Sequence, residues 1–129
     1  MAMRKIKLLV VDDEKDICKF VKLIFKKKGF LVYSAFSGEA AIRIARRTKP
    51  DIALLDIYLK KGIDGLETLK GINKVALYCK CIMVTWDKAE DKIKEARREG
   101  AVSYLVKPLT IEQLLKVVSR VVKGLRKRG

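Results

Sequence analysis

The stretch that decides the fold is KIKLLVVDDE, residues 5–14. Residues 6–11 form a short, mostly apolar run that is typical of a buried β-strand, and this run stops at Asp12 and Asp13. Two further apolar runs end in the same way, residues 52–55 at Asp56 and residues 82–84 at Thr85. Parallel strands of an open α/β sheet bring their carboxyl ends to one edge, where such sheets bind ligands. The pattern therefore predicts three carboxylates and a hydroxyl at one edge of a sheet.

Strand and helix patterns alternate five times along the chain. The predicted strands cover residues 6–11, 30–34, 51–55, 81–85 and 102–106, and the predicted helices cover residues 14–28, 37–48, 65–73, 87–100 and a last segment that begins after residue 110. This alternation implies right-handed crossovers and a parallel sheet with helices on both faces. The predicted fold is α/β, a flavodoxin-like doubly wound (βα)5 domain with strand order 2-1-3-4-5.

Local signals predict where several helices begin and end. Gly29 is expected in the left-handed position that follows the first helix. Asp87 with Glu90 resembles a capping pair for the fourth helix, and Thr110 with Gln113 forms a capping-box pattern for the last one. The apolar face of the last helix consists of Ile111, Leu114, Leu115, Val118, Val121, Val122 and Leu125.

Length and composition favour a single domain. The chain has 129 residues, half of them hydrophobic and two of them proline, without a repetitive or Ser/Gly-rich linker. We expect one domain over residues 1–129, with a core over about residues 5–125 and a basic tail at residues 126–129. The apolar runs are shorter than a signal sequence or a membrane span requires, so we expect a cytoplasmic protein without a membrane partner.

Neither the cysteines nor the lysines require a functional explanation. Cys18, Cys79 and Cys81 lack metal-ligand spacing, and the chain has no histidine, so we expect small buried thiols. Thirty Lys and Arg against fifteen Asp and Glu give a formal charge of +15. Lysines at helical spacing, as at residues 15, 19, 22 and 26, are typical of a solvated helix face. A basic nucleic-acid-binding module on the same fold stays open as the alternative, and it predicts salt-sensitive binding.

The polar residues at the strand ends also have ordinary explanations when each is taken alone. Asp12 or Asp13 alone is commonly the cap of the next helix, whereas Asp56 has no immediate helix to cap. Thr85 and Lys107 alone are unremarkable. Crowded carboxylates repel one another, and a bound cation relieves the repulsion; oxygen ligands select Mg²⁺ or Mn²⁺. Together these residues indicate a site for a cation and a phosphoryl group.

The same residues resemble the receiver domain of two-component response regulators, and most of all its chemotaxis-regulator-like members. The matching motifs are Val10-Val11-Asp12-Asp13-Glu14, Leu54-Leu55-Asp56-Ile57, Asp64-Gly65-Leu66-Glu67, Met83-Val84-Thr85 and Tyr104-Leu105-Val106-Lys107-Pro108. They occur in order and span essentially the whole chain.

The resemblance implies a phosphoacceptor in a phosphorelay, not an enzyme that turns over an external metabolite. Asp56 would attack a phosphohistidine on a histidine kinase or phosphotransfer protein and form an aspartyl phosphate. Asp13, Asp56 and the main-chain carbonyl of Tyr58 would bind Mg²⁺ (or Mn²⁺) directly, and Asp12 would act through a metal-bound water.

The resemblance also implies a conformational switch. Thr85 and Lys107 would bind phosphoryl oxygens, and Thr85 and Tyr104 would then move together and change the face made by the fourth helix, fifth strand and fifth helix. A homodimer through that face is open. Pro108 would follow a cis peptide bond that directs the Lys107 amine to the site.

Three features depart from the family pattern, and one of them is the formal charge of +15, which exceeds the charge expected of the family. The loop at residues 58–65 lacks the usual proline and is one residue longer than the commonest form, and Trp86 occupies a position where a small residue is usual. We expect Trp86 to slow phosphorylation by small donors such as acetyl phosphate. A third interpretation, a flavin or nucleotide protein, is disfavoured because no glycine-rich loop follows the first strand and Asp13-Glu14-Lys15-Asp16 would repel an anionic cofactor.

Overall fold

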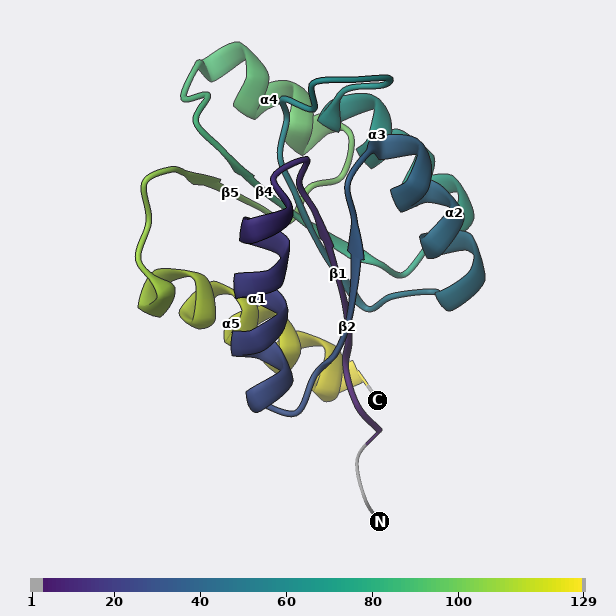
Figure 1. Cartoon of the computed structure of the whole chain (residues 1–129), viewed down its shortest axis with the longest axis vertical. Helices are drawn as coiled ribbons and strands as arrows, with labels where there is room; N and C mark the ends of the chain where they lie inside the picture. The colour runs from purple at the N-terminus through teal and green to yellow at the C-terminus, as the bar shows by residue number, and fades with distance from the viewer. Residues whose placement is uncertain (1–3, 129) are drawn as a thin grey trace.

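The computed structural model describes residues 4–128, which fold around one five-stranded parallel sheet (Figure 1). The strands are β1 (Lys7–Val11), β2 (Leu31–Ala35), β3 (Ile52–Leu55), β4 (Lys80–Thr85) and β5 (Ser103–Val106). The helices are α1 (Lys15–Lys27), α2 (Gly38–Thr48), α3 (Gly65–Val75), α4 (Glu90–Arg98) and α5 (Ile111–Arg128). The strand order is β2-β1-β3-β4-β5, so the predicted fold class and topology are confirmed.

Helices cover both faces of the sheet and bury two separate cores (Figure 1). Alternate residues of β1 point to opposite faces, so Leu8 and Val10 pack with α1 and α5, whereas Leu9 and Val11 pack with α2, α3 and α4. Because both faces are covered, β1 beyond Lys7 and the whole of β3 are apolar and buried, as the sequence pattern predicts.

Most of the predicted helix ends are confirmed. Gly29 has a φ of +90°, the left-handed conformation that glycine adopts without strain. At the start of α5 the amide of Gln113 donates to Thr110 Oγ1 at 3.1 Å, and Gln113 Oε1 accepts from the Thr110 amide at 2.8 Å. This reciprocal pair is the predicted capping box.

The predicted capping pair of α4 is wrong. The residue before this helix is Ala89, which has no side chain able to cap it, and Glu90 is the first helical residue. Asp87 lies two residues before the capping position, and its carboxylate has other partners: Oδ1 accepts from the amide of Ala89 at 2.9 Å, and Oδ2 accepts from the hydroxyl of Tyr58 at 2.5 Å. A tertiary contact therefore takes the carboxylate that the pattern assigned to the helix.

The predicted basic tail is also corrected. Helix α5 continues to Arg128, so residues 126–128 form its last turn and not a separate segment. Leu125 is half-buried against the core on the α1 side, so the apolar face of α5 continues into its last turns. Gly129 and the segment Met1–Met3 lie outside the described residues, so the single-domain span of residues 1–129 stays a prediction.

Two further expectations concern burial and membranes. Cys18, Cys79 and Cys81 are all buried and unpaired, as predicted for small core thiols. Within residues 4–128, none of the helices combines the length and the apolar character needed to traverse a bilayer.

Candidate functional site

The register of the sheet places Asp12 and Asp56 side by side. Val11 pairs with Leu55, so the residues that follow these two strand ends are neighbours. The amide of Asp56 donates to the carbonyl of Val11 at 3.3 Å, which extends the contact between β1 and β3 to Asp56. Both carboxylates are nearly inaccessible to solvent, with exposures of 5% for Asp12 and 7% for Asp56.

Lys107 connects these two carboxylates. Its Nζ lies 3.0 Å from Asp56 Oδ2 and 3.4 Å from Asp12 Oδ2. Its main-chain amide donates to the carbonyl of Thr85 at 2.8 Å, which fixes the lysine beside the end of β4. The peptide bond between Lys107 and Pro108 is cis, as predicted. Three residues far apart in sequence thus meet at the carboxyl edge of the sheet.

Burial and charge oppose each other at this cluster. Burial raises the pKa of Asp12, the nearby charge of Asp56 adds to the rise, and the hydrogen bond from Glu14 and the charge of Lys107 only partly offset it. Burial alone would lower the pKa of Lys107, but its hydrogen bond to Asp56 and the charges of both carboxylates outweigh burial and raise it. One ammonium faces two carboxylates, so the cluster favours a further positive charge.

Asp13, the third predicted carboxylate, binds the loop that follows Asp56. Its Oδ2 accepts a hydrogen bond from the amide of Lys60 at 2.9 Å, in the loop after β3. Over residues 4–128 no three acidic or thiol side chains are grouped as a formed metal cage. The structure thus brings Asp12 and Asp56 together and holds Asp13 at the adjoining loop.

Thr85 and Tyr104 are linked through Asp87. Thr85 is fully buried, and its Oγ1 accepts from the amide of Asp87 at 3.3 Å. The hydroxyl of half-buried Tyr104 donates to the Asp87 carbonyl at 2.6 Å, and burial, then the charge of Asp87, raises the pKa of Tyr104 to about 12. The hydroxyl of exposed Tyr58 donates to the Asp87 carboxylate, which lowers the pKa of Asp87.

Asp87 is the site residue that sequence reasoning missed. Its partners Tyr58 and Tyr104 come from other elements, 29 and 17 positions away in the chain. No local pattern signals such a contact; the only available sign was an aspartate two residues after Thr85 at a strand end.

The loop between β3 and α3 is held close to Asp56. Gly65 must be glycine, because a Cβ there would lie 2.0 Å from the main-chain oxygen of Asp56. Gly62 has a φ of +77°, and the following amide, that of Ile63, donates to Glu39 Oε2 at 3.1 Å. This anchoring gives the long loop a defined path despite its missing proline.

Trp86 lies at the protein surface. Its side chain is 63% exposed, and it directly follows buried Thr85. Its influence on access to Asp56 stays a prediction.

Comparisons with known proteins show the family to which the chain is similar. The family model of the response regulator receiver domain matches residues 8–119. The sporulation initiation phosphotransferase F of Bacillus subtilis is 31% identical over 114 residues, which are 88% of this chain and 91% of that protein. A CheY-like receiver domain protein of Methanospirillum hungatei superposes with a TM-score of 0.92 at 26% identity, covering 98% of this chain and 100% of that one.

A third similar protein was solved with ligands bound. In the CheX-CheY-BeF3-Mg²⁺ complex of Borrelia burgdorferi, the matching chain has a TM-score of 0.83 and 30% identity, with coverage of 91% of this chain and 89% of that one. Nothing in these likenesses supports the nucleic-acid-binding alternative. With the fold, the edge cluster and the family match in agreement, the chain belongs to the receiver domains of two-component response regulators and is a phosphorelay signalling domain.

Proposed function

We propose that Asp56 is the phosphoryl acceptor of this receiver domain. The observation that carries the proposal is the Lys107 ammonium, 3.0 Å from the Asp56 carboxylate at the carboxyl edge of the sheet. Transfer breaks the bond between phosphorus and the histidine nitrogen of a partner kinase or phosphotransfer protein and forms a bond to an Asp56 oxygen. The electrons of the broken bond go to the histidine nitrogen, and the ring leaves as neutral imidazole when its other nitrogen carries a proton. A carboxylate that attacks has no proton to lose, so the domain needs no general base.

Lys107 and Thr85 bind the phosphoryl group in this proposal. The ammonium offsets negative charge on the phosphoryl oxygens, and its raised pKa keeps it protonated at neutral pH. The Thr85 hydroxyl, which accepts from Asp87 in this structure, is a donor available to a phosphoryl oxygen. The chain's contribution is therefore mainly positioning and charge compensation.

The donor set fits a hard divalent cation. The groups we assign to Mg²⁺, or to Mn²⁺, are Asp12, Asp13, Asp56 and the main-chain carbonyl of Tyr58. All of them offer oxygen, and the chain has no histidine that would favour zinc. When bound, the cation neutralises charge on the phosphoryl oxygens. Asp13 can serve as a ligand although it accepts a hydrogen bond from the Lys60 amide, because its carboxylate keeps further lone pairs for a cation.

The contacts around Asp87 supply the switch that we propose. Thr85 and Tyr104 both bind Asp87, so a change at the Thr85 hydroxyl alters the anchor of the Tyr104 ring. Tyr104 lies on β5, next to α4, and its displacement would reshape the face formed by α4, β5 and α5. That face is our candidate for the output contact or for a homodimer. The domain acts as a signalling phosphoacceptor and not as an enzyme for an external substrate.

The test is phosphoryl uptake from phosphoramidate, a small donor with a phosphorus–nitrogen bond, measured by intact mass spectrometry with and without Mg²⁺. Wild type is expected to gain one phosphoryl group only with Mg²⁺, and Asp56→Asn is expected to gain none. Asp51→Asn is the matched control, because Asp51 binds Arg4 at the opposite end of the strands. Uptake by Asp56→Asn, or uptake of the wild type that is equal in EDTA, would refute the assignment.

A further inference from the structure

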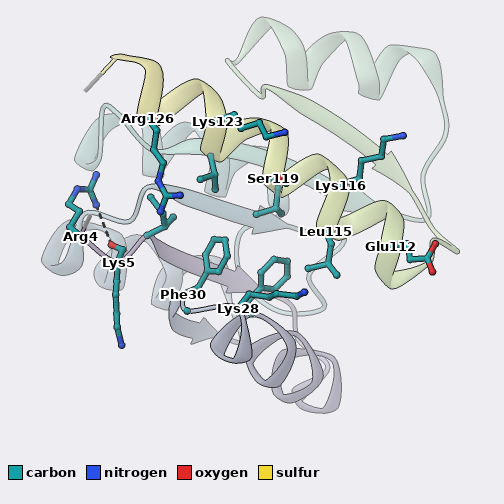
Figure 2. Close-up of a pocket in the computed structure, with 15 residues that line it drawn as sticks. Arg4, Lys5, Lys28, Phe30, Glu112, Leu115, Lys116, Ser119, Lys123 and Arg126 are labelled. Atoms are coloured by element: carbon teal, nitrogen blue, oxygen red, sulfur yellow. Dashed lines mark hydrogen bonds between the residues drawn. The ribbon is translucent and has the colours of Figure 1, made fainter. Parts of the chain in front are cut away.

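A groove of about 710 Å³ lies between α1 and α5, at the edge of the sheet opposite to Asp12 and Asp56 (Figure 2). Its walls are the end of α1, the residues before β1 and the length of α5 from Glu112 to Arg126. Figure 2 shows Phe30 and Leu115 from opposite walls facing the space between the helices. The phosphoryl chemistry uses none of these residues.

The floor of the groove is apolar and firmly packed. Phe25 and Val118 are almost completely buried, while Phe30 and Leu115 are half-buried and present their apolar surface to the groove. The rings of Phe25 and Phe30 meet edge to face, with centroids 5.2 Å apart. A partner therefore meets a preformed apolar surface and not a flexible one.

The rim of the groove is strongly basic. The exposed cations at the rim are Lys5, Lys28, Lys116, Lys123 and Arg126. Within residues 4–128 none of these five has a carboxylate within ion-pair distance, whereas Arg4, also at the rim, is paired with Asp51. Glu112 is the one acidic residue that lines the described groove. The rim selects an anionic partner, and the floor selects an apolar face.

We propose that this groove binds an acidic amphipathic helix of a partner protein. From Glu112 to Arg126 the α5 wall is about 21 Å long, which is the length of about four turns of a second helix. A helix with apolar residues at positions i, i+3, i+4 and i+7 fills such a floor, and acidic residues on its flanks meet the rim. The proposal goes beyond phosphoryl transfer and does not depend on Asp56.

Other occupants fit the groove less well. A second copy of the chain would bring two basic rims together, and like charges repel. Nucleic acid would match the charge, but the groove offers one partly exposed aromatic ring, that of Phe30, and not the series of rings on which successive bases stack. A flat lipid surface does not enter a concave groove, so its apolar floor would stay unfilled.

The binding test uses a synthetic peptide of about 16 residues with leucine at one helical face and glutamate elsewhere, titrated into ¹⁵N-labelled protein. The control peptide has the same composition in scrambled order. We expect micromolar binding of the amphipathic peptide alone, with amide shifts that centre on Phe30, Leu115 and Ser119. The Asp56→Asn variant is expected to bind equally well. Equal binding of the scrambled peptide, or the absence of shifts at the groove, would overturn the proposal.

A pair of matched variants distinguishes binding in the groove from non-specific electrostatic attraction of the peptide to the protein. Lys116→Glu with Lys123→Glu reverses two rim charges, and Arg43→Glu with Arg47→Glu makes the same charge change on exposed positions of α2. The rim variant is expected to weaken peptide binding about tenfold, and the α2 variant is expected to leave it unchanged. Equal weakening by both variants would contradict a defined site.

A steric variant and a vesicle-binding measurement test the groove independently of the rim charge. Ser119→Tyr narrows the groove from an exposed position of α5 without changing charge, and it is expected to abolish peptide binding even if the rim variant fails to fold. Phosphatidylglycerol vesicles are expected not to bind through the rim. If the wild type bound vesicles but not the peptide, and the rim variant lost vesicle binding, the groove would be a lipid site and a protein partner would be refuted.

Discussion

Lys107 supplies the ammonium that Asp12 and Asp56 share, so it governs the balance of charge at the site. Removing one partner of a buried ion pair leaves the remaining charge without compensation, which costs more than the pair itself contributes. Lys107→Met leaves two buried carboxylates facing each other. The free energy of unfolding at pH 7 is expected to fall by about 2 kcal/mol.

Acid reduces this penalty in the Lys107→Met variant. Burial already raises the pKa of Asp12, and the loss of Lys107 raises it further, so protonation of Asp12 as the pH falls removes the repulsion. Urea unfolding of wild type, of this variant and of the surface control Lys94→Met, followed at pH 7 and pH 5, measures the effect. A penalty that is the same at both pH values would show that lost packing, and not charge, is its cause.

The stabilisation by Asp51 depends on pH in the opposite direction: it decreases in acid. Burial alone would raise its pKa, but two hydrogen bonds from Arg4, at 2.6 and 2.8 Å, and one from the amide of Lys7, at 2.8 Å, lower it. A lowered pKa means that the stabilisation is complete above the unfolded value, about 3.9, and is lost as pH falls through the folded value.

Asp51→Asn is therefore expected to destabilise the protein by about 1 kcal/mol at pH 7 and by progressively less below about pH 4. Urea midpoints of the variant and the wild type across this range provide the measurement. If the difference grew in acid, the assigned hydrogen bonds would not be the source of the stabilisation.

The loop between Asp56 and α3 requires a residue without a side chain at position 65. A Cβ at Gly65 would lie 2.0 Å from the carbonyl oxygen of Asp56, and main-chain atoms cannot yield cheaply. Gly65→Ala is expected to cost more than about 2 kcal/mol and to slow phosphoryl uptake, because the loop must move together with Asp56.

The matched control is Gly124→Ala in α5. A Cβ at Gly124 meets no atom within 4 Å, and alanine is the better helix former, so this variant is expected to gain about 0.5–1 kcal/mol. Thermal unfolding of both variants tests the pair. Equal destabilisation by the two alanines would mean that the close approach at Gly65 is not the cause.

The elements were largely predictable from local sequence. Apolar runs located β1, β3 and β4 because these strands are buried on both faces, and Thr110 with Gln113 located the start of α5 because a capping box closes within four residues. The α4 cap failed because Asp87 binds Tyr58 across the fold, which no short-range pattern records. The Asp13 contact with Lys60 was missed for the same reason.

The site and the groove differ in how far sequence could anticipate them. Asp12, Asp56 and Lys107 follow strand ends, and the topology of a parallel sheet brings strand ends together. The apolar face of α5 was also visible, but periodicity reveals only which side of a helix is apolar. Leu115 stays half-buried because α5 and α1 leave a groove between them, a property of packing and not of either helix.

The formal charge of +15 acts on the whole molecule. Residues 4–128 contain few ion pairs to offset it: the carboxylates that take part are those of Asp12, Asp51, Asp56 and Glu99. Repulsion among exposed lysines and arginines therefore opposes the compact state.

Salt is expected to stabilise this domain. Raising NaCl from about 0.02 M to about 0.5 M shortens the screening length from about 20 Å to about 4 Å, which weakens repulsion between distant surface charges. The urea midpoint should rise, and it should rise less in the variant with Arg43→Glu and Arg47→Glu, whose charge is smaller. A midpoint that falls with salt would mean that attractive pairs dominate the surface.

The buried cysteines make the two sides of the sheet chemically distinguishable. Cys18 belongs to the core beneath α1 and α5, and burial raises its pKa to about 11; Cys79 and Cys81 belong to the opposite core, where their mutual hydrogen bond and burial raise the pKa of Cys79. A thiol reagent can modify these residues only when the overlying helices separate from the sheet. Labelling kinetics of Cys18→Ala and of Cys79→Ala with Cys81→Ala would time the exposure of each side independently. Because both cores share β1, β3 and β4, we expect the two sides to open together and the modification rates to coincide.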